Sequence, residues 1–305
     1  MKNNEAESVY RFYRYRLRSN FDLGEPLDGT GYDLTLYAQL GNAYREQPEH
    51  IFEDRDGSFH IQSPFASYRI SSKQRSIWVA YDDAESVRST LFHLPAAAFA
   101  MGEGNLLLHA SGLYADGRVV AFCGPKGVGK STLISLLGRI TQIFSDDTML
   151  LSERDMLVCA CAQSGRLRLT PETCRIHSSN PCLYEHAPKS IQGKAYVNAE
   201  AIGAKTYPLQ ANDSPTLSTL VVLHRHTDLN FRLRPVCSQL EKKSLLMANS
   251  IGISFLAPQS RKHLCMGKTF QQMLSAVRFL HLYLPNDLAT LKDQYPQILT
   301  SILAV

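Results

Sequence analysis

Nine consecutive residues constrain this sequence more than any others. Residues 124–132 read Gly-Pro-Lys-Gly-Val-Gly-Lys-Ser-Thr and fit the pattern G-x-x-x-x-G-K-[ST] without a mismatch. The apolar run Val119–Cys123 precedes them, and the helix-forming run Ser131–Gly138 leaves them. Glycines let the backbone curl so that several N–H groups face one anion, and the start of a helix adds a partial positive charge. A strand, a glycine-rich loop and a helix in this order predict a phosphate-binding loop within an α/β fold.

Each part of this loop has an expected task in binding a nucleotide. Lys130 provides a mobile cation for the β- and γ-phosphates, and the Ser131 hydroxyl is expected to coordinate Mg²⁺. The loop therefore predicts ATP and Mg²⁺ as cofactors. The expected nucleotide-binding residues are Gly124, Pro125, Lys126, Gly127, Val128, Gly129, Lys130, Ser131 and Thr132.

Two adjacent carboxylates follow the loop closely. Asp146 and Asp147 stand sixteen and seventeen residues after Lys130, where the apolar segment Ile143–Phe144 ends. The ends of strands form the edge at which α/β sheets bind ligands. Beside Mg²⁺ and a γ-phosphate, one carboxylate can accept a proton from an attacking hydroxyl while the other steadies the metal. The alternative is a solvated turn, because Ser-Asp-Asp is also common in turns.

His109 is a polar residue inside the apolar segment Leu106–Leu113, which we predict to form one strand. A turn at Asp116-Gly117 joins this strand to the strand that enters the loop, so His109 can reach the two carboxylates. The alternative is a structural histidine whose ring finds its hydrogen-bond partner in the core.

Taken together, His109, the phosphate loop and the Asp146-Asp147 pair resemble the core of HPr kinase/phosphorylase. That family carries a histidine strand, a Walker A loop and a closely following Asp-Asp pair, and its fold is similar to that of phosphoenolpyruvate carboxykinase. The resemblance covers about residues 105–152. It implies that Asp146 is the catalytic base, that His109 sits against it, and that Asp147 helps Ser131 to hold Mg²⁺.

The segment Gly165–Glu172 indicates which HPr-kinase-like proteins the chain resembles most. Where HPr kinases carry an L-E-I-R-G-type segment, this chain reads Gly-Arg-Leu-Arg-Leu-Thr-Pro-Glu. That looks like the smaller HPr-kinase-like proteins found beside peptide natural-product genes, notably lasso peptide kinases, which phosphorylate a serine at the end of a precursor peptide. Arg166 and Arg168 share one strand face, where they either meet phosphates or a peptide carboxylate or are merely solvated.

The remaining pattern predicts a P-loop kinase core preceded by a small β-rich domain. Short alternating segments separated by turn signals fill residues 1–82, and residues 83–305 are assigned to the catalytic domain. Within these ranges, Tyr10–Arg18 is expected to form a half-buried strand and Thr269–Leu284 a helix. The basic side of that strand is either a solvated edge or a docking strip for an acidic peptide or phosphate.

A weaker signal is His224-x-His226, which places two imidazoles on one strand face at a spacing seen in metal sites. No third ligand is apparent near them in the sequence. The pair alone therefore does not predict a metal site.

The composition argues against two classes of partner, nucleic acids and membranes. The 305 residues include 32 Lys and Arg against 28 Asp and Glu, and the net charge of +4 is too small to argue for nucleic acid. The longest apolar stretch, Leu91–Met101, is interrupted by His93 and Pro95 and is shorter than the about 20 residues that span a bilayer. The seven cysteines include no CxxC pair, which favours reduced thiols. We therefore expect a cytoplasmic protein without a membrane or nucleic-acid partner.

These features predict a serine kinase that transfers the γ-phosphoryl group of ATP to a serine hydroxyl of a peptide or protein. The narrowest form of the prediction is the C-terminal serine of a lasso precursor peptide. Two alternatives stay open, a kinase of a small-molecule alcohol and a regulator that binds ATP without transferring it. The Asp146-Asp147 pair argues against the regulator, because a sensor needs no base. The sequence also leaves open ATP against GTP, a dephosphorylating activity, and the oligomeric state, a homo-oligomer included.

Overall fold

The chain forms a mixed α/β protein that divides into two compact units. Unit 1 comprises residues 1–107, 211–213 and 250–271, and unit 2 comprises residues 108–210, 214–249 and 272–305. The computed structural model describes residues 7–23, 26, 31–40, 50–62, 66–162, 166–177, 182–185, 187, 193–208, 214–256 and 258–304.

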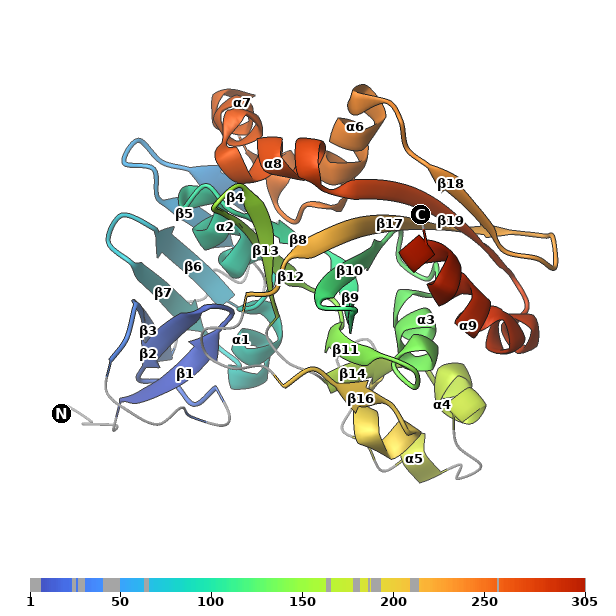
Figure 1. Ribbon diagram of the computed structural model, residues 1–305. Helices are drawn as coiled ribbons and strands as arrows, with labels where there is room; N and C mark the ends of the chain where they lie inside the picture. The colour runs from blue at the N-terminus through green and yellow to red at the C-terminus, as the bar shows by residue number, and fades with distance from the viewer. Residues whose placement is uncertain are drawn as a thin grey trace. The chain divides into compact units, whose positions relative to one another are not determined.

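Unit 1 is built on a seven-stranded sheet with the strand order β1-β2-β3-β7-β6-β5-β4 (Figure 1). β3 pairs in parallel with β2 and β7, and the other neighbours are antiparallel. The strands are β1 (Ser8–Phe12), β2 (Tyr15–Ser19), β3 (Leu34–Leu40), β4 (His50–Glu53), β5 (Phe59–Gln62), β6 (Ala66–Ser71) and β7 (Ser76–Tyr81).

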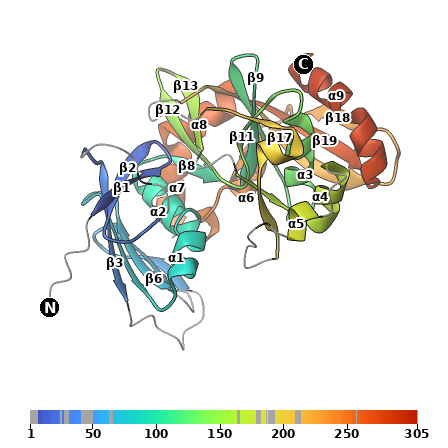
Figure 2. The same ribbon diagram turned by 90° about the horizontal axis from the view of Figure 1, so that it is seen from below.

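Two helices, α1 (Ala84–Thr90) and α2 (Leu94–Gly102), pack on one face of this sheet (Figure 2). α2 buries an alanine-rich surface, and its Phe99 packs edge-on against Tyr15 with ring centroids 5.2 Å apart. These helices therefore belong to unit 1. The division into two units differs from the predicted domain boundary after residue 82. A boundary at that residue would separate α2 from the sheet that it covers.

The segment Tyr10–Arg18 is a hairpin and not the single strand that the alternation predicts. A turn at Tyr13 and Arg14 separates β1 from β2, and Tyr13 adopts a φ of 55° there. The Tyr13 hydroxyl donates a hydrogen bond to the Phe92 carbonyl at 2.8 Å, which fixes the turn within unit 1. The turn carries none of the usual glycine or asparagine signals, so the sequence did not reveal it.

Unit 2 is built on a second seven-stranded sheet, with the order β16-β11-β9-β10-β17-β19-β18. The parallel strands β10 (Arg118–Cys123), β17 (Leu217–His226) and β19 (Arg278–Pro285) form its middle. β9 (Ala110–Ala115) pairs antiparallel with both β10 and β11 (Gln142–Ser145). The edges are β16 (Lys205–Thr206) and β18 (Arg232–Pro235).

Helices α3 (Lys130–Leu137) and α9 (Leu288–Ala304) pack together on one face of the unit 2 sheet (Figures 1 and 2). The core beneath them includes Phe122, Leu133 and Ile298, all fully buried. This packing sets α3 behind the loop that follows β10, as the strand–loop–helix pattern predicts.

The predicted helix Thr269–Leu284 is wrong over its second half. The helix α8 (Lys268–Ala276) ends before β19, which pairs with β17 on one side and β18 on the other. A central strand that is buried on both faces reads as a nearly continuous apolar run, so periodicity alone did not separate it from a helix. The predicted strand Leu106–Leu113 is likewise divided, into β8 (Leu106–Leu108) and β9, with His109 between them.

Shorter elements complete the chain. They are β12 (Met149–Arg154), β13 (Leu157–Ala162), β14 (Arg166–Leu169), β15 (Ala195–Asn198), α4 (Pro171–His177), α5 (Cys182–Glu185), α6 (Gln239–Asn249) and α7 (Pro258–Met266), with 3₁₀ turns at Ala199–Ile202 and Ile253–Phe255. Within the described residues, no helix is both long and apolar enough to cross a membrane.

Candidate functional site

The glycine-rich loop connects β10 to α3. Gly124, Gly127 and Gly129 have φ values of 140°, 84° and 103°, which other residues adopt only under strain. Lys130 is buried, and its Nζ donates to the carbonyl oxygens of Gly124 at 2.8 Å and Pro125 at 3.4 Å. Burial lowers the pKa of Lys130, while the nearby Asp146 and Asp147 among other groups act in the opposite direction. The loop is therefore curled around its own lysine.

Asp146 accepts three hydrogen bonds beside this loop. Its Oδ1 accepts from the hydroxyls of Ser131 at 2.9 Å and Ser111 at 3.0 Å, and its Oδ2 accepts from the Arg168 backbone N–H at 2.7 Å. Although the residue as a whole is half-buried, protein atoms enclose the carboxylate. This burial raises the pKa of Asp146 despite the hydrogen bonds, which act to lower it.

Asp147 has a different set of partners. Its φ of 99° lies in the left-handed region, a conformation that costs energy for any residue with a side chain. The Arg168 guanidinium forms an ion pair with its Oδ1, and His109 Nδ1 lies 3.8 Å from the same oxygen. The structure thus brings His109, the aspartate pair and Ser131 together, and the Ser131 hydroxyl donates its hydrogen bond to Asp146.

The structure describes the side-chain contacts of Arg168 but not those of Arg166. Arg168 holds both aspartates, one through its backbone N–H and the other through its guanidinium. A role of Arg168 towards phosphates or a peptide carboxylate stays a prediction. Arg166 begins β14, and its side chain lies outside the described part of the structure.

Thr132, the last predicted residue of the loop, faces α4. Its Oγ1 is 2.8 Å from the Thr173 hydroxyl, and one turn later Ser135 Oγ is 2.7 Å from His177 Nε2. Desolvation lowers the pKa of His177 to about 4. These contacts anchor the phosphate-loop helix to α4.

Arg225, on β17, is a residue of this site that no sequence motif indicated. Its Nε donates to the Val128 carbonyl at 2.8 Å, and its Nη1 donates to the Pro285 carbonyl. Gly129 lies directly against the guanidinium, because a Cβ added there would be 2.3 Å from Nη2. Arg225 therefore packs on the phosphate loop, although it stands 96 positions after Gly129 in the sequence.

The histidines of His224-x-His226 bind different partners. His224 Nε2 is 2.7 Å from His281 Nδ1, whose Nε2 is 2.9 Å from Glu241 on α6. His226 lies 3.6 Å from Asp228. Among the described residues, no cluster of three or more His, Cys, Asp or Glu could hold a metal ion.

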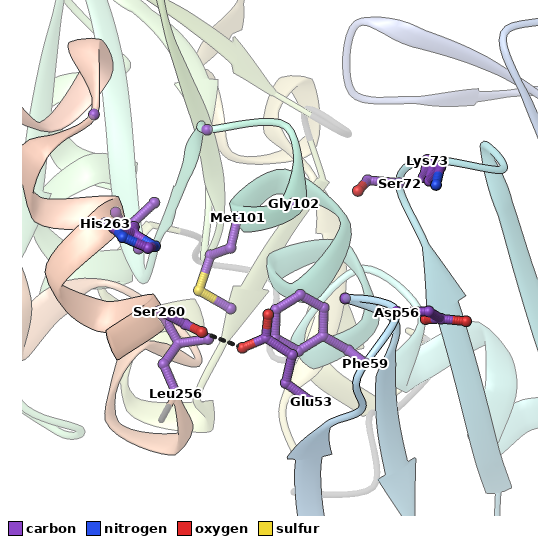
Figure 3. A pocket seen from close by; sticks show the side chains of 14 residues that line it. Glu53, Asp56, Phe59, Ser72, Lys73, Met101, Gly102, Leu256, Ser260 and His263 are labelled. Carbon is purple, nitrogen blue, oxygen red and sulfur yellow. Dashed lines mark hydrogen bonds between the residues drawn. The ribbon is translucent and has the colours of Figure 1, made fainter. Parts of the chain in front are cut away.

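Unit 1 contains a cavity of about 390 Å³ (Figure 3). Apolar side chains of Phe59, Met101, Leu256 and Leu264 form much of its lining, and Glu53 accepts a hydrogen bond from Ser260 at one side. Carboxylates and basic groups both line it, so its charge favours neither a cation nor an anion. The acidic and basic lining residues are Glu53, Asp56, Lys73 and His263.

Comparison with known proteins adds a distant likeness among solved structures. No family model matches the chain, and no curated protein matches it. Among solved structures it is similar to the HPr(Ser) kinase/phosphatase from Coxiella burnetii, with 13% identity, a TM-score of 0.34, and coverage of 65% of this chain and 97% of that one. A likeness this distant leaves the function to be argued from the site.

Proposed function

We propose that this protein is an ATP- and Mg²⁺-dependent kinase that phosphorylates a serine hydroxyl of a peptide. The observation that carries the proposal is the enclosed carboxylate of Asp146, hydrogen-bonded to Ser131 at the start of the phosphate-loop helix. Burial raises the pKa of Asp146, and a general base works best when its pKa approaches the working pH. A bare nucleotide-binding site would have no use for such a group.

The phosphate loop would bind the triphosphate through its backbone N–H groups, with Lys130 neutralising charge on the β- and γ-phosphates. The serine oxygen forms a bond to the γ-phosphorus as the bond from that phosphorus to the β–γ bridging oxygen breaks. The hydroxyl proton passes to Asp146, and ADP leaves with the bridging oxygen. Positioning and charge stabilisation provide most of the acceleration in such a transfer.

The donor set beside the loop suits Mg²⁺, which takes oxygen ligands and keeps several waters. We assign the metal to Ser131 and Asp147, where it would neutralise phosphate charge when bound. The hydrogen bond from Ser131 to Asp146 makes the reversed assignment the alternative, with Asp146 at the metal and Asp147 beside His109 as the base.

For the acceptor, we propose a serine at or near the C-terminus of a short precursor peptide, as the resemblance of Gly165–Glu172 to lasso peptide kinases implies. An in-line transfer requires the acceptor oxygen to reach the carboxylate pair. A flexible peptide end can enter such a site with few fixed contacts.

The test is to incubate the full chain with ATP, Mg²⁺ and a precursor peptide ending in serine, and to measure peptide mass. Phosphorylation adds about 80 Da, the mass of one HPO₃ unit. A peptide ending in alanine is the acceptor control. The enzyme control is Lys130→Ala. Its transfer rate should fall on the order of 100-fold or more, because the phosphate charge is no longer neutralised.

Each alternative function gives a distinct result. Phosphate on a small alcohol, with none on any peptide, would replace the acceptor while keeping a kinase. Nucleotide binding without transfer to any acceptor would favour the ATP-binding regulator.

A further inference from the structure

Arg225 is a half-buried cation that has no counter-ion within the part of the chain that the structure describes. Among the described residues, no carboxylate lies within ion-pair distance of it, and its hydrogen bonds go to the backbone carbonyls of Val128 and Pro285. Arg168 differs in this respect, since its guanidinium pairs with Asp147. Burial without a compensating charge lowers the pKa of Arg225.

A charge taken out of water is costly unless an opposite charge accompanies it. Two carbonyl oxygens satisfy part of the guanidinium, but they carry only partial negative charge. Nη2 has no acceptor in the described part of the chain, although it carries two N–H donors. An anion bound beside Nη2 would accept from these donors and supply the missing opposite charge.

The anion has one evident place, which is the phosphate loop itself. Nη2 lies against Gly129, the residue immediately before the loop helix, and no side chain other than hydrogen fits between them. Arg225 also projects from the face of the sheet that α3 covers. Its partner on the neighbouring strand β19 is Leu284, which is buried in the core beneath α3. The guanidinium is thus held at the helix start, where backbone N–H groups bind phosphate.

The strand order indicates which phosphate is involved. Asp146 and Asp147 follow β11, and β11, β9, β10 and β17 lie in that order across the sheet. Arg225 therefore stands on the side of the loop strand that is opposite the carboxylate pair. The γ-phosphate must lie near the carboxylates for transfer, so the phosphates nearer the nucleoside fall on the β17 side.

We infer that Arg225 is a second phosphate-binding residue of this site, which pairs with the α- or β-phosphate of the nucleotide. The inference rests on the proposed nucleotide-dependent function and adds a cation outside the loop motif. It also gives a second reason for glycine at position 129. This residue adopts the positive φ that the loop requires, and its lack of a side chain leaves space for the guanidinium.

The experiment measures the affinities of the full chain for MgATP and MgADP by calorimetry, using Arg225→Gln and Arg225→Lys. Glutamine removes the charge but can still donate to a carbonyl. We expect it to weaken ATP and ADP binding equally, by about 10- to 100-fold, the usual cost of a hydrogen bond to a charged group. Lysine keeps the charge and should retain most of the affinity. Thermal unfolding of each variant without nucleotide confirms that the chain is folded.

Three results would overturn the inference. Unchanged affinities in Arg225→Gln would remove the residue from the anion site. An equal loss in both variants would mean that Arg225 acts as a clamp on the loop and not as a phosphate ligand. A loss for ATP alone would place it at the γ-phosphate. Because the experiment measures binding and not phosphoryl transfer, these results are independent of whether the protein proves to be a kinase.

Discussion

Asp146 is subject to opposing requirements from stability and from chemistry. Its carboxylate is enclosed by protein, and burial raises its pKa above the ordinary value of 3.8. The folded state therefore holds the proton more tightly than the unfolded chain does, so its contribution to stability is present at low pH. That contribution is lost as the pH rises through the folded-state pKa. Above that pKa the ionised, buried carboxylate destabilises the fold.

This cost predicts that Asp146→Asn is more stable than the wild type at neutral pH. An amide carries no charge to desolvate, and the Ser131 and Ser111 hydroxyls can accept from it as readily as they donate. Thermal unfolding at pH 8 and pH 4 measures the effect. The gain in melting temperature should shrink on acidification, and a variant that melts below the wild type at pH 8 would contradict the assigned cause.

The same substitution separates binding from transfer. We expect Asp146→Asn to bind nucleotide with nearly wild-type affinity while phosphoryl transfer collapses, because only the proton acceptor is removed. The comparison is Asp147→Asn, which alters the proposed metal ligand one residue away. If Asp147→Asn transfers more slowly than Asp146→Asn, the two roles are reversed, and if both variants remain active, the reaction does not use this pair.

At the scale of elements, His177 couples α4 to the phosphate-loop helix. Desolvation, reinforced by Arg139 and Lys292, lowers its pKa from 6.5 to about 4, so the folded state keeps the ring neutral. The unfolded chain begins to take up the proton near pH 6.5. Stability is therefore full above that pH and is lost as the pH falls from about 6.5 towards about 4.

Replacing His177 by glutamine should remove this part of the acid sensitivity. Urea unfolding at pH 7 and pH 4.5 compares the wild type with His177→Gln and with the control His263→Gln, an exposed histidine on α7. We expect the drop in unfolding free energy between the two pH values to be smaller in His177→Gln alone. Equal drops in all three proteins would show that other groups cause the acid sensitivity.

The elements differ in how far the sequence could predict them. The phosphate loop, β10 and α3 follow from local rules, because glycine conformations and the start of a helix depend on neighbouring residues. β19 was mistaken for a helix because burial on both faces erases the alternation of a strand. Arg225 reaches Gly129 only through the pairing of β17 with β10, which no local pattern encodes.

At the scale of the whole molecule, the chain leaves unit 1 and returns to it. Residues 250–271 belong to the same unit as the N-terminal sheet, and a Cβ added at Gly252 would lie 3.1 Å from Met101 of α2. α7, within that returning segment, contributes Ser260, whose hydroxyl donates to Glu53 of β4. Unit 1 is consequently assembled from segments far apart in the sequence.

This organisation predicts that a fragment of residues 83–305 does not fold as an independent domain. Removing the sheet would expose the α2 surface, where Phe99 is 1% exposed and packs on Tyr15. We expect the fragment to aggregate or to unfold without cooperativity in size-exclusion and thermal experiments, while the full chain does neither. Within the full chain, Phe99→Ala should lower the free energy of unfolding by about 3–5 kcal/mol, the usual cost of emptying an aromatic site in a core. A monomeric fragment with a cooperative transition would instead support a domain boundary near residue 82.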